Sequence, residues 1–217
     1  MSFEAEFQAF LEKQRREASG TRLDMLQKDL VGEKKLFQEV LWPIFQTFEG
    51  FVLEYELQSS SGVTMYIDAF FKPYGIAFES DGYVVHGENI SRSRFSFEKQ
   101  RVRTMAKGGI VYMPFSWDEL DKRAEQCRAS VFELLSRFRA SPDSTLSVYE
   151  REAIRYALRL GRPIRREDLF SLFKKSDWIV RKVIKSLVDK SLIIPLKPSN
   201  SRHYEYVVDK NALKFIL

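Results

Sequence analysis

Apolar residues in the N-terminal part of the chain recur at intervals of three and four, the spacing that collects side chains on one face of a helix. The pattern predicts helices around residues 3–11 and 23–30 and a third helix over residues 33–48. In the third helix Glu33 falls within the apolar stripe, whereas Glu39 points well away from it. We therefore expect Glu33 to face inward and Glu39 to face solvent.

The pattern then changes to short runs of β-branched and aromatic residues. Runs at residues 51–58, 63–71 and 75–80 are separated by Ser/Gly and Pro/Gly turns, which predicts three antiparallel strands. A basic helix at residues 92–108 and a fourth strand at residues 109–115 follow.

Two serines mark helix starts by the capping-box pattern, in which a glutamate follows the serine three residues later. Ser116 and Glu119 open a predicted long helix that continues to about residue 138. Ser147 and Glu150 open another helix.

Between these two helices, at residues 140–144, apolar residues give way to Ala, Ser, Pro and Asp, which is typical of a linker. We therefore predict two domains, residues 1–140 and residues 146–217. The first has the α+β order of helices, three strands, helix, strand and helix.

The predicted C-terminal domain contains three helices followed by two strands. Its first two helices cover about residues 148–160 and 165–173, and its strands cover residues 192–196 and 203–208. The third helix has an apolar face formed by Ile179, Val180, Val183, Ile184, Leu187 and Val188.

Composition and charge narrow the class of protein. The chain has 217 residues, of which 44% are hydrophobic, so it can form a folded core. Its single cysteine, Cys127, rules out an internal disulfide, and no apolar run is long enough to span a membrane. The N-terminal residues lack the features of a signal peptide, so we expect a cytoplasmic protein.

The charge is unevenly distributed between the two predicted domains. Residues 1–140 carry 19 Lys and Arg against 21 Asp and Glu, and residues 141–217 carry 16 against 9, so the balances are −2 and +7. A basic module of this kind favours nucleic acid as a partner, although a solvated basic face is the alternative.

Three acids lie in and just after the second and third strands. A four-residue turn at residues 72–75 pairs Asp68 with Glu79 and puts Asp81 on the same face, opposite a continuous apolar face. A bulged turn with a left-handed Gly75 would shift the register by one residue and split the apolar face. The hydrophobic pattern therefore favours the first register.

Acids placed opposite each other on neighbouring strands repel, unless a cation neutralises them or one of them stays protonated. Oxygen ligands favour Mg²⁺ or Mn²⁺, and the sequence has no His/Cys spacing typical of zinc sites. Such a site suits phosphodiester hydrolysis. Strand-edge acids that simply face water are the alternative interpretation.

At these residues the chain resembles a known family. The order of elements from residue 33 to about residue 120, with Asp68, then Glu79-Ser80-Asp81-Gly82, then His86 and a helix carrying Arg101, is similar to the PD-(D/E)XK nuclease superfamily. Within that superfamily it most resembles the branch of the very-short-patch-repair endonucleases.

The resemblance implies a restriction-endonuclease-like core and a set of site residues. Its implied metal ligands are Asp68, Glu79 and Glu33, and its implied catalytic residues are Asp68, Glu79, Asp81, His86 and Arg101. Two features depart from the family pattern. Asp81 occupies the position of the superfamily lysine, and His86 lies one residue farther along than in the branch.

Basic residues on the predicted helix at residues 92–108 are accompanied by a single acid, Glu98. This face is either solvated or placed to hold a phosphate backbone. The residues that we predict to bind DNA there are Arg94, Lys99 and Arg103.

The C-terminal domain resembles a winged helix-turn-helix, in which the third helix enters the major groove and the hairpin touches the backbone. The resemblance implies DNA contacts from Trp178, Arg181, Lys182, Lys185 and Arg202. Many winged helices bind proteins instead, so an adaptor function is also open.

The sequence thus supports a metal-dependent DNA endonuclease with a winged helix for DNA binding. The first alternative is a DNA-binding or regulatory protein that kept the nuclease fold and lost cleavage, which the departures at Asp81 and His86 favour. A protein-interaction adaptor is the second. DNA is the expected partner, no membrane is involved, and the sequence leaves open whether the chain acts as a homodimer.

Overall fold

The computed structural model describes residues 2–82, 91–138, 146–197 and 205–215. The chain divides into two compact units, which consist of residues 1–42 with 47–127 (the first unit) and of residues 43–46 with 128–217 (the second unit). The linker predicted at residues 140–144 lies outside the described residues. Among those residues, no helix combines the length and the apolar character that crossing a bilayer would require.

The N-terminal helices overlap the predicted ones, but the helix predicted around residues 23–30 begins earlier and ends at Leu26. They are α1 (Phe3–Glu17), α2 (Gly20–Leu26), α3 (Val31–Leu36), the π-helical turn η1 (Phe37–Leu41) and α4 (Trp42–Phe45). The helix predicted over residues 33–48 is thus formed by three consecutive helical segments, of which the middle one is a π-helical turn. Glu39, expected to face solvent, is half-buried.

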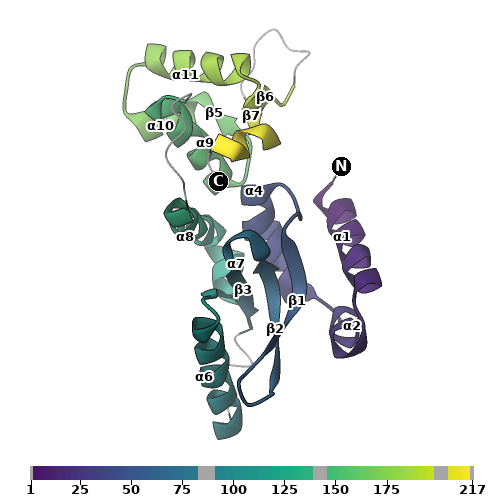
Figure 1. Cartoon of the computed structure of the whole chain (residues 1–217). Helices are drawn as coiled ribbons and strands as arrows, with labels where there is room; N and C mark the ends of the chain where they lie inside the picture. The colour runs from purple at the N-terminus through teal and green to yellow at the C-terminus, as the bar shows by residue number, and fades with distance from the viewer. Residues whose placement is uncertain (1, 83–90, 139–145, 198–204, 216–217) are drawn as a thin grey trace. The chain divides into compact units, whose positions relative to one another are not determined.

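The first unit contains a four-stranded sheet in the order β1-β2-β3-β4. Its strands are β1 (Phe51–Gln58), β2 (Thr64–Phe71), β3 (Ile76–Asp81) and β4 (Val111–Ser116). β1, β2 and β3 are antiparallel, and β4 runs parallel to β3 after the helix α6 (Arg92–Lys107). Helices α1 and α2 pack beside β1, which is an edge strand (Figure 1).

The register between β2 and β3 is the one that the hydrophobic pattern favours. Phe71 pairs with Ile76, and Ala69 pairs with Phe78. The turn between them is the 3₁₀ segment η2 (Lys72–Tyr74), which ends at Gly75 with a left-handed φ of 63°. A left-handed Gly75 is therefore compatible with the predicted register. It does not shift the pairing here, because it ends a 3₁₀ turn formed by Lys72–Tyr74.

Both faces of the sheet are covered. On one face Phe37 of η1 contacts Phe51, and Phe51 in turn contacts Phe71 and Phe78. On the opposite face, apolar side chains of the sheet pack against Met105 of α6. Acids on that second face are consequently buried, which a simple half-solvated antiparallel sheet would not require.

The helix predicted from Ser116 to about residue 138 is broken. The capping box of Ser116 and Glu119 is present, but the chain forms α7 (Trp117–Lys122), α8 (Ala124–Leu135) and the 3₁₀ turn η3 (Ser136–Phe138). The break falls at Arg123, whose φ of −138° is incompatible with an α-helix. The continuous helix was therefore a wrong prediction.

The second unit has the three predicted helices, α9 (Val148–Leu160), α10 (Arg166–Phe173) and α11 (Asp177–Asp189). Its sheet is antiparallel in the order β5-β7-β6, formed by β5 (Ile164–Arg165), β6 (Ile193–Pro195) and β7 (Glu205–Val208), and a 3₁₀ segment η4 (Lys210–Phe215) follows. The short strand β5 was not predicted. The capping box of Ser147 and Glu150 is present at the start of α9.

Candidate metal centre

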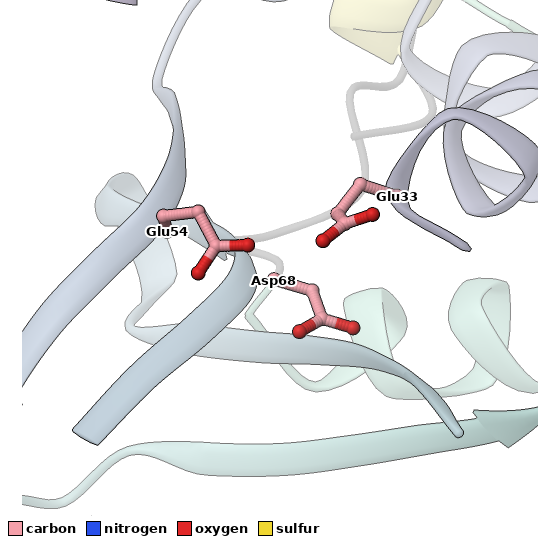
Figure 2. Close-up of side chains that lie close together, drawn as sticks. All are labelled: Glu33, Glu54 and Asp68. Atoms are coloured by element: carbon pink, nitrogen blue, oxygen red, sulfur yellow. The ribbon is translucent and has the colours of Figure 1, made fainter. Parts of the chain in front are cut away.

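Three acidic side chains from three different elements meet in the first unit. Glu33 comes from α3, Glu54 from β1 and Asp68 from β2, and one oxygen of each lies within 4.8 Å of the others. Figure 2 shows the three side chains close together. We call these residues the acidic triad.

A glycine allows α3 to bring Glu33 close to the sheet. A β carbon at Gly32 would lie 3.1 Å from the side-chain oxygen of Ser80 on β3, which is closer than ordinary van der Waals contact. Because glycine has no β carbon, α3 can approach β3 at this point. The neighbouring Glu33 then lies over the sheet rather than beside it.

Glu54 has an unusual backbone conformation for a residue in a strand. Its φ is 48°, in the left-handed region, and the pairing of β1 with β2 is interrupted there, between the pairs Leu53–Ala69 and Tyr55–Ile67. The register places Glu54 opposite Asp68. A residue held in such a conformation costs about 1–3 kcal/mol, and residues of this kind gather at functional sites.

A second group of charges adjoins the triad. The backbone N–H of Ser80 donates a hydrogen bond of 2.8 Å to Oδ2 of Asp68. Glu79, which is 1% exposed, forms an ion pair with Arg101 of α6, and Arg101 also donates to the carbonyl of Tyr66. Arg101 is itself 9% exposed, so this is a buried ion pair.

Burial raises the pKa values of all four acids. It raises the pKa of Glu33 to about 9, and the charge of Asp68 adds to the rise. Burial also raises the pKa of Glu54, and it raises the pKa of Asp68 although the hydrogen bond from Ser80 acts in the opposite direction. For Glu79, burial and the charge of Asp68 outweigh the attraction of Arg101, so its pKa lies well above its ordinary value. The folded chain therefore holds protons here unless a cation replaces them.

The donor set of the triad fits a hard divalent cation. All three donors are carboxylate oxygens, with no histidine or cysteine among them. Oxygens bound to Mg²⁺ on opposite sides, at about 2.1 Å each, lie about 4.2 Å apart. Only one pair among three ligands can be opposite, and neighbouring ligands lie about 3.0 Å apart, so the triad, whose oxygens lie within 4.8 Å of one another, would have to contract to hold Mg²⁺ or Mn²⁺.

The structure brings together most of the predicted site residues in the described part of the chain. Glu33 and Asp68 lie in the triad, and Glu79 and Arg101 lie beside it as an ion pair. Asp81 ends β3, and burial, with the charges of Asp81 and Glu79, raises the pKa of Tyr112 on β4. His86 lies outside the described residues.

Glu54 is the site residue that the sequence pattern did not identify. It interrupts the apolar run of β1 as a charged residue between Leu53 and Tyr55. Pairing β1 with β2 across the polar residues 59–63 would have placed it opposite Asp68. The register of these two strands was therefore the feature of the sequence from which Glu54 could have been identified.

Helix α6 presents a basic face to solvent. Among the described residues, none of its exposed cations forms an ion pair; these cations are Arg92, Arg94, Lys99, Arg103 and Lys107. Phe95 is 52% exposed on the same helix, and the ammonium group of Lys99 lies 5.0 Å from the centre of its ring. Arg94, Lys99 and Arg103 are thus available to a polyanion.

Helix α11 of the second unit presents a different surface. Trp178 is 68% exposed, and the ammonium group of Lys182 lies 5.2 Å from the centre of its ring. The other two predicted cations form ion pairs with acids of the same helix, Arg181 with Asp177 at 2.6 Å and Lys185 with Asp189 at 2.8 Å. Arg202 lies outside the described residues.

Comparisons with known proteins do not assign the chain to a family. No protein-family model matches it, and neither the curated proteins nor the solved structures give a match. Its described residues define a mixed α/β protein with a carboxylate cluster under one sheet, and a function has to be inferred from that cluster and its surroundings.

Proposed function

We propose that the chain is a metal-dependent phosphodiester hydrolase that acts on DNA. The observation that carries the proposal is the acidic triad, in which one carboxylate oxygen of the buried Glu54 and one each of the half-buried Glu33 and Asp68 lie within 4.8 Å of one another. The order of elements around it, with α3, three antiparallel strands, α6 and the parallel strand β4, supports the resemblance to the PD-(D/E)XK nucleases.

Each residue of the site has a role in this proposal. Glu33, Glu54 and Asp68 would hold Mg²⁺ or Mn²⁺. When bound, the cation would supply Lewis-acid stabilisation of the charge that develops on the phosphate oxygens. Arg101 keeps the carboxylate of Glu79 in place and contributes positive charge beside the triad. Asp81 lies next to this pair.

The exposed cations of α6 would hold a flanking stretch of the DNA backbone, on the side of the helix away from Arg101. Arg101 faces the sheet from the same helix that exposes Lys99 and Arg103, so a phosphate backbone held on the exposed face would lie about one helix diameter, roughly 10 Å, from the buried side. Contacts of this kind fix the orientation of the duplex and carry no sequence information.

The second unit would supply a further DNA contact as a winged helix. Three helices followed by a small antiparallel sheet support this proposal. Because Arg181 and Lys185 are paired with acids of α11, the exposed Trp178 and its neighbour Lys182 are the strongest candidates for contact on that helix.

Two observations favour a second candidate, a DNA-binding protein that has lost cleavage. Glu79, the expected second metal ligand, forms a buried ion pair with Arg101, and Asp81 stands where the superfamily has a lysine. In that case the triad would hold a structural cation or protons.

The test is cleavage of plasmid and short duplex DNA in Mg²⁺ or Mn²⁺ by the wild type, Asp68→Asn and Glu54→Gln. Glu56→Gln, an exposed acid two residues farther along β1, is the matched control. Cleavage that depends on the metal and disappears in both triad variants but not in the control supports the nuclease. DNA binding that weakens with salt, without cleavage, supports the second candidate. Absence of any salt-dependent DNA binding would leave the adaptor function.

A further inference from the structure

We propose that Arg22 is a positioning residue that holds Glu54 in the acidic triad. The inference rests on the metal site of the proposed function. It concerns how the chain keeps a strand residue in the left-handed conformation that brings its carboxyl group to Glu33 and Asp68.

The contacts of Arg22 depend on that conformation. Its Nε donates to the carbonyl oxygen of Leu53 at 3.2 Å and to that of Glu54 at 3.1 Å, and its Nη2 donates to the Leu53 carbonyl at 2.8 Å. In a regular strand, successive carbonyl groups point to opposite edges. One guanidinium can therefore bind both carbonyls only because the chain turns at Glu54.

Gln14 of α1 completes this arrangement. Its Oε1 accepts hydrogen bonds from Nη2 of Arg22 at 2.6 Å and from the backbone N–H of Leu53 at 3.3 Å, and its side chain is buried. Both polar backbone groups of Leu53 are thus bonded from α1 and α2, on the side of β1 where the sheet has no further strand.

The pairing of β1 with β2 shows what the alternative conformation would be. Leu53 directs its backbone groups outward, so the next residue of a regular strand, Glu54, would direct its own groups to Asp68. That pair is missing from the register. Without Arg22, β1 can close the gap as an extended strand, and the carbonyl that Arg22 now holds turns inward.

A consequence follows for the side chain of Glu54. Changing φ from the left-handed to the extended region redirects the bond from Cα to Cβ. In a regular pair the side chain would stand directly beside that of Asp68 on one face of the sheet, so its carboxyl group would no longer have its present position relative to Glu33. Arg22 itself is not among the triad residues. It would act on metal binding through Glu54 alone.

The test is the affinity for Mn²⁺, measured by titration calorimetry on the full chain without DNA. We expect Arg22→Gln and Glu54→Gln each to weaken Mn²⁺ binding by about tenfold or more, the range found for residues that orient metal ligands. The double variant should bind no more weakly than Glu54→Gln alone, because both changes remove the same ligand. A merely structural role of Arg22 would instead weaken binding by a similar factor in both backgrounds.

Arg15→Gln is the matched control. Arg15 also binds a backbone carbonyl, that of Leu26, through its Nε at 2.9 Å, and Leu26 lies outside β1. It should leave the Mn²⁺ affinity within about twofold of the wild type, since distant sites act independently. If Arg22→Gln does not fold, Arg22→Lys keeps the charge and should still lower the affinity, because an ammonium lacks the planar fork that reaches both carbonyls.

The outcomes separate this inference from the proposed function. Wild-type affinity in Arg22→Gln or Arg22→Lys, together with weakened binding in Glu54→Gln, overturns the role of Arg22 and leaves the metal site intact. A wild type that does not bind Mn²⁺, or a Glu54→Gln variant that binds it normally, overturns both.

Discussion

In metal-free buffer, the first unit should become less stable as the pH rises from about 6 to about 8. The pKa of Glu33 is about 9 in the folded chain, against an ordinary value of 4.5. In this window the folded chain therefore keeps a proton on Glu33 that the unfolded chain releases. A state that binds more protons is favoured at low pH, so the stabilisation is complete below the ordinary pKa and disappears as the pH approaches 9.

The size of the effect follows from linkage. A difference of one bound proton changes the free energy of unfolding by about 1.4 kcal/mol per pH unit, which gives at most about 2.7 kcal/mol between pH 6 and pH 8. Because Glu33 is only partly buried, solvent screening reduces this value, and we expect about 1–2 kcal/mol. Glu33→Gln carries no titratable proton and should reduce the dependence, while the raised pKa values of Glu54, Asp68 and Glu79 leave part of it in place.

Urea unfolding in EDTA, followed by tryptophan fluorescence, measures this free energy. The assay uses a Trp178→Phe background, so that Trp42 and Trp117 report on the first unit. Mg²⁺ should remove the loss at high pH, because it binds the ionised carboxylates of the folded state. Glu56→Gln is the control, since it removes an exposed acid from the same sheet. An equal pH slope in the wild type and in Glu33→Gln would refute the reasoning.

Three further predictions follow from particular contacts. Arg101→Met should destabilise the first unit by about 3–5 kcal/mol, because it leaves Glu79 buried without its partner. Adding Glu79→Gln should recover much of this loss, as measured by thermal melting. Equal melting temperatures of the single and double variants would contradict the prediction. Gly161→Ala should lower the free energy of unfolding, measured by denaturation, by at least about 1–2 kcal/mol. The φ of Gly161 is 67°, and a β carbon there would lie 2.9 Å from the guanidinium carbon of Arg128. Lys99→Ala and Arg103→Ala should each lower the slope of log K against log salt for duplex DNA by about 0.9 if each contacts one phosphate, and an unchanged slope in both would exclude α6 from the interface.

The order of elements and the register of the second hairpin could be predicted because they depend on local patterns. The Pro/Gly turn at residues 72–75 and the alternation around it allow one register that keeps a continuous apolar face. The structure adopts that register, with Ala69 opposite Phe78. Both capping boxes, at Ser116 and Ser147, could be predicted for the same reason, since each uses residues three positions apart.

Features that depend on distant residues could not be predicted in this way. The carbonyl of Glu54, in its left-handed conformation, accepts a hydrogen bond from Arg22, which lies 32 positions earlier in the chain. No local pattern predicts a left-handed glutamate inside a strand. The strand β5 has two residues and exists only because Ile164 and Arg165 pair with β7. No proline or glycine lies at the helix break at Arg123, so the local sequence does not predict this break.

The burial of acid under this sheet has a physical explanation once both faces are known to be covered. Arg101 offsets part of the cost of burying Glu79, although burial and the charge of Asp68 still raise the pKa of Glu79 well above its ordinary value. Glu33, Glu54 and Asp68 lie close together, and Asp68 accepts a hydrogen bond from the backbone N–H of Ser80. The charge of Arg101 lowers the pKa values of Glu54 and Asp68, but burial outweighs this effect. Each of the three would be more stable as an ionised group if positive charge lay between them. The chain holds Glu54 in a costly left-handed conformation, against the regular pairing of its own strand, so the space between the three side chains stays lined with oxygen atoms. A divalent cation is the partner whose charge and ligand preference match this space.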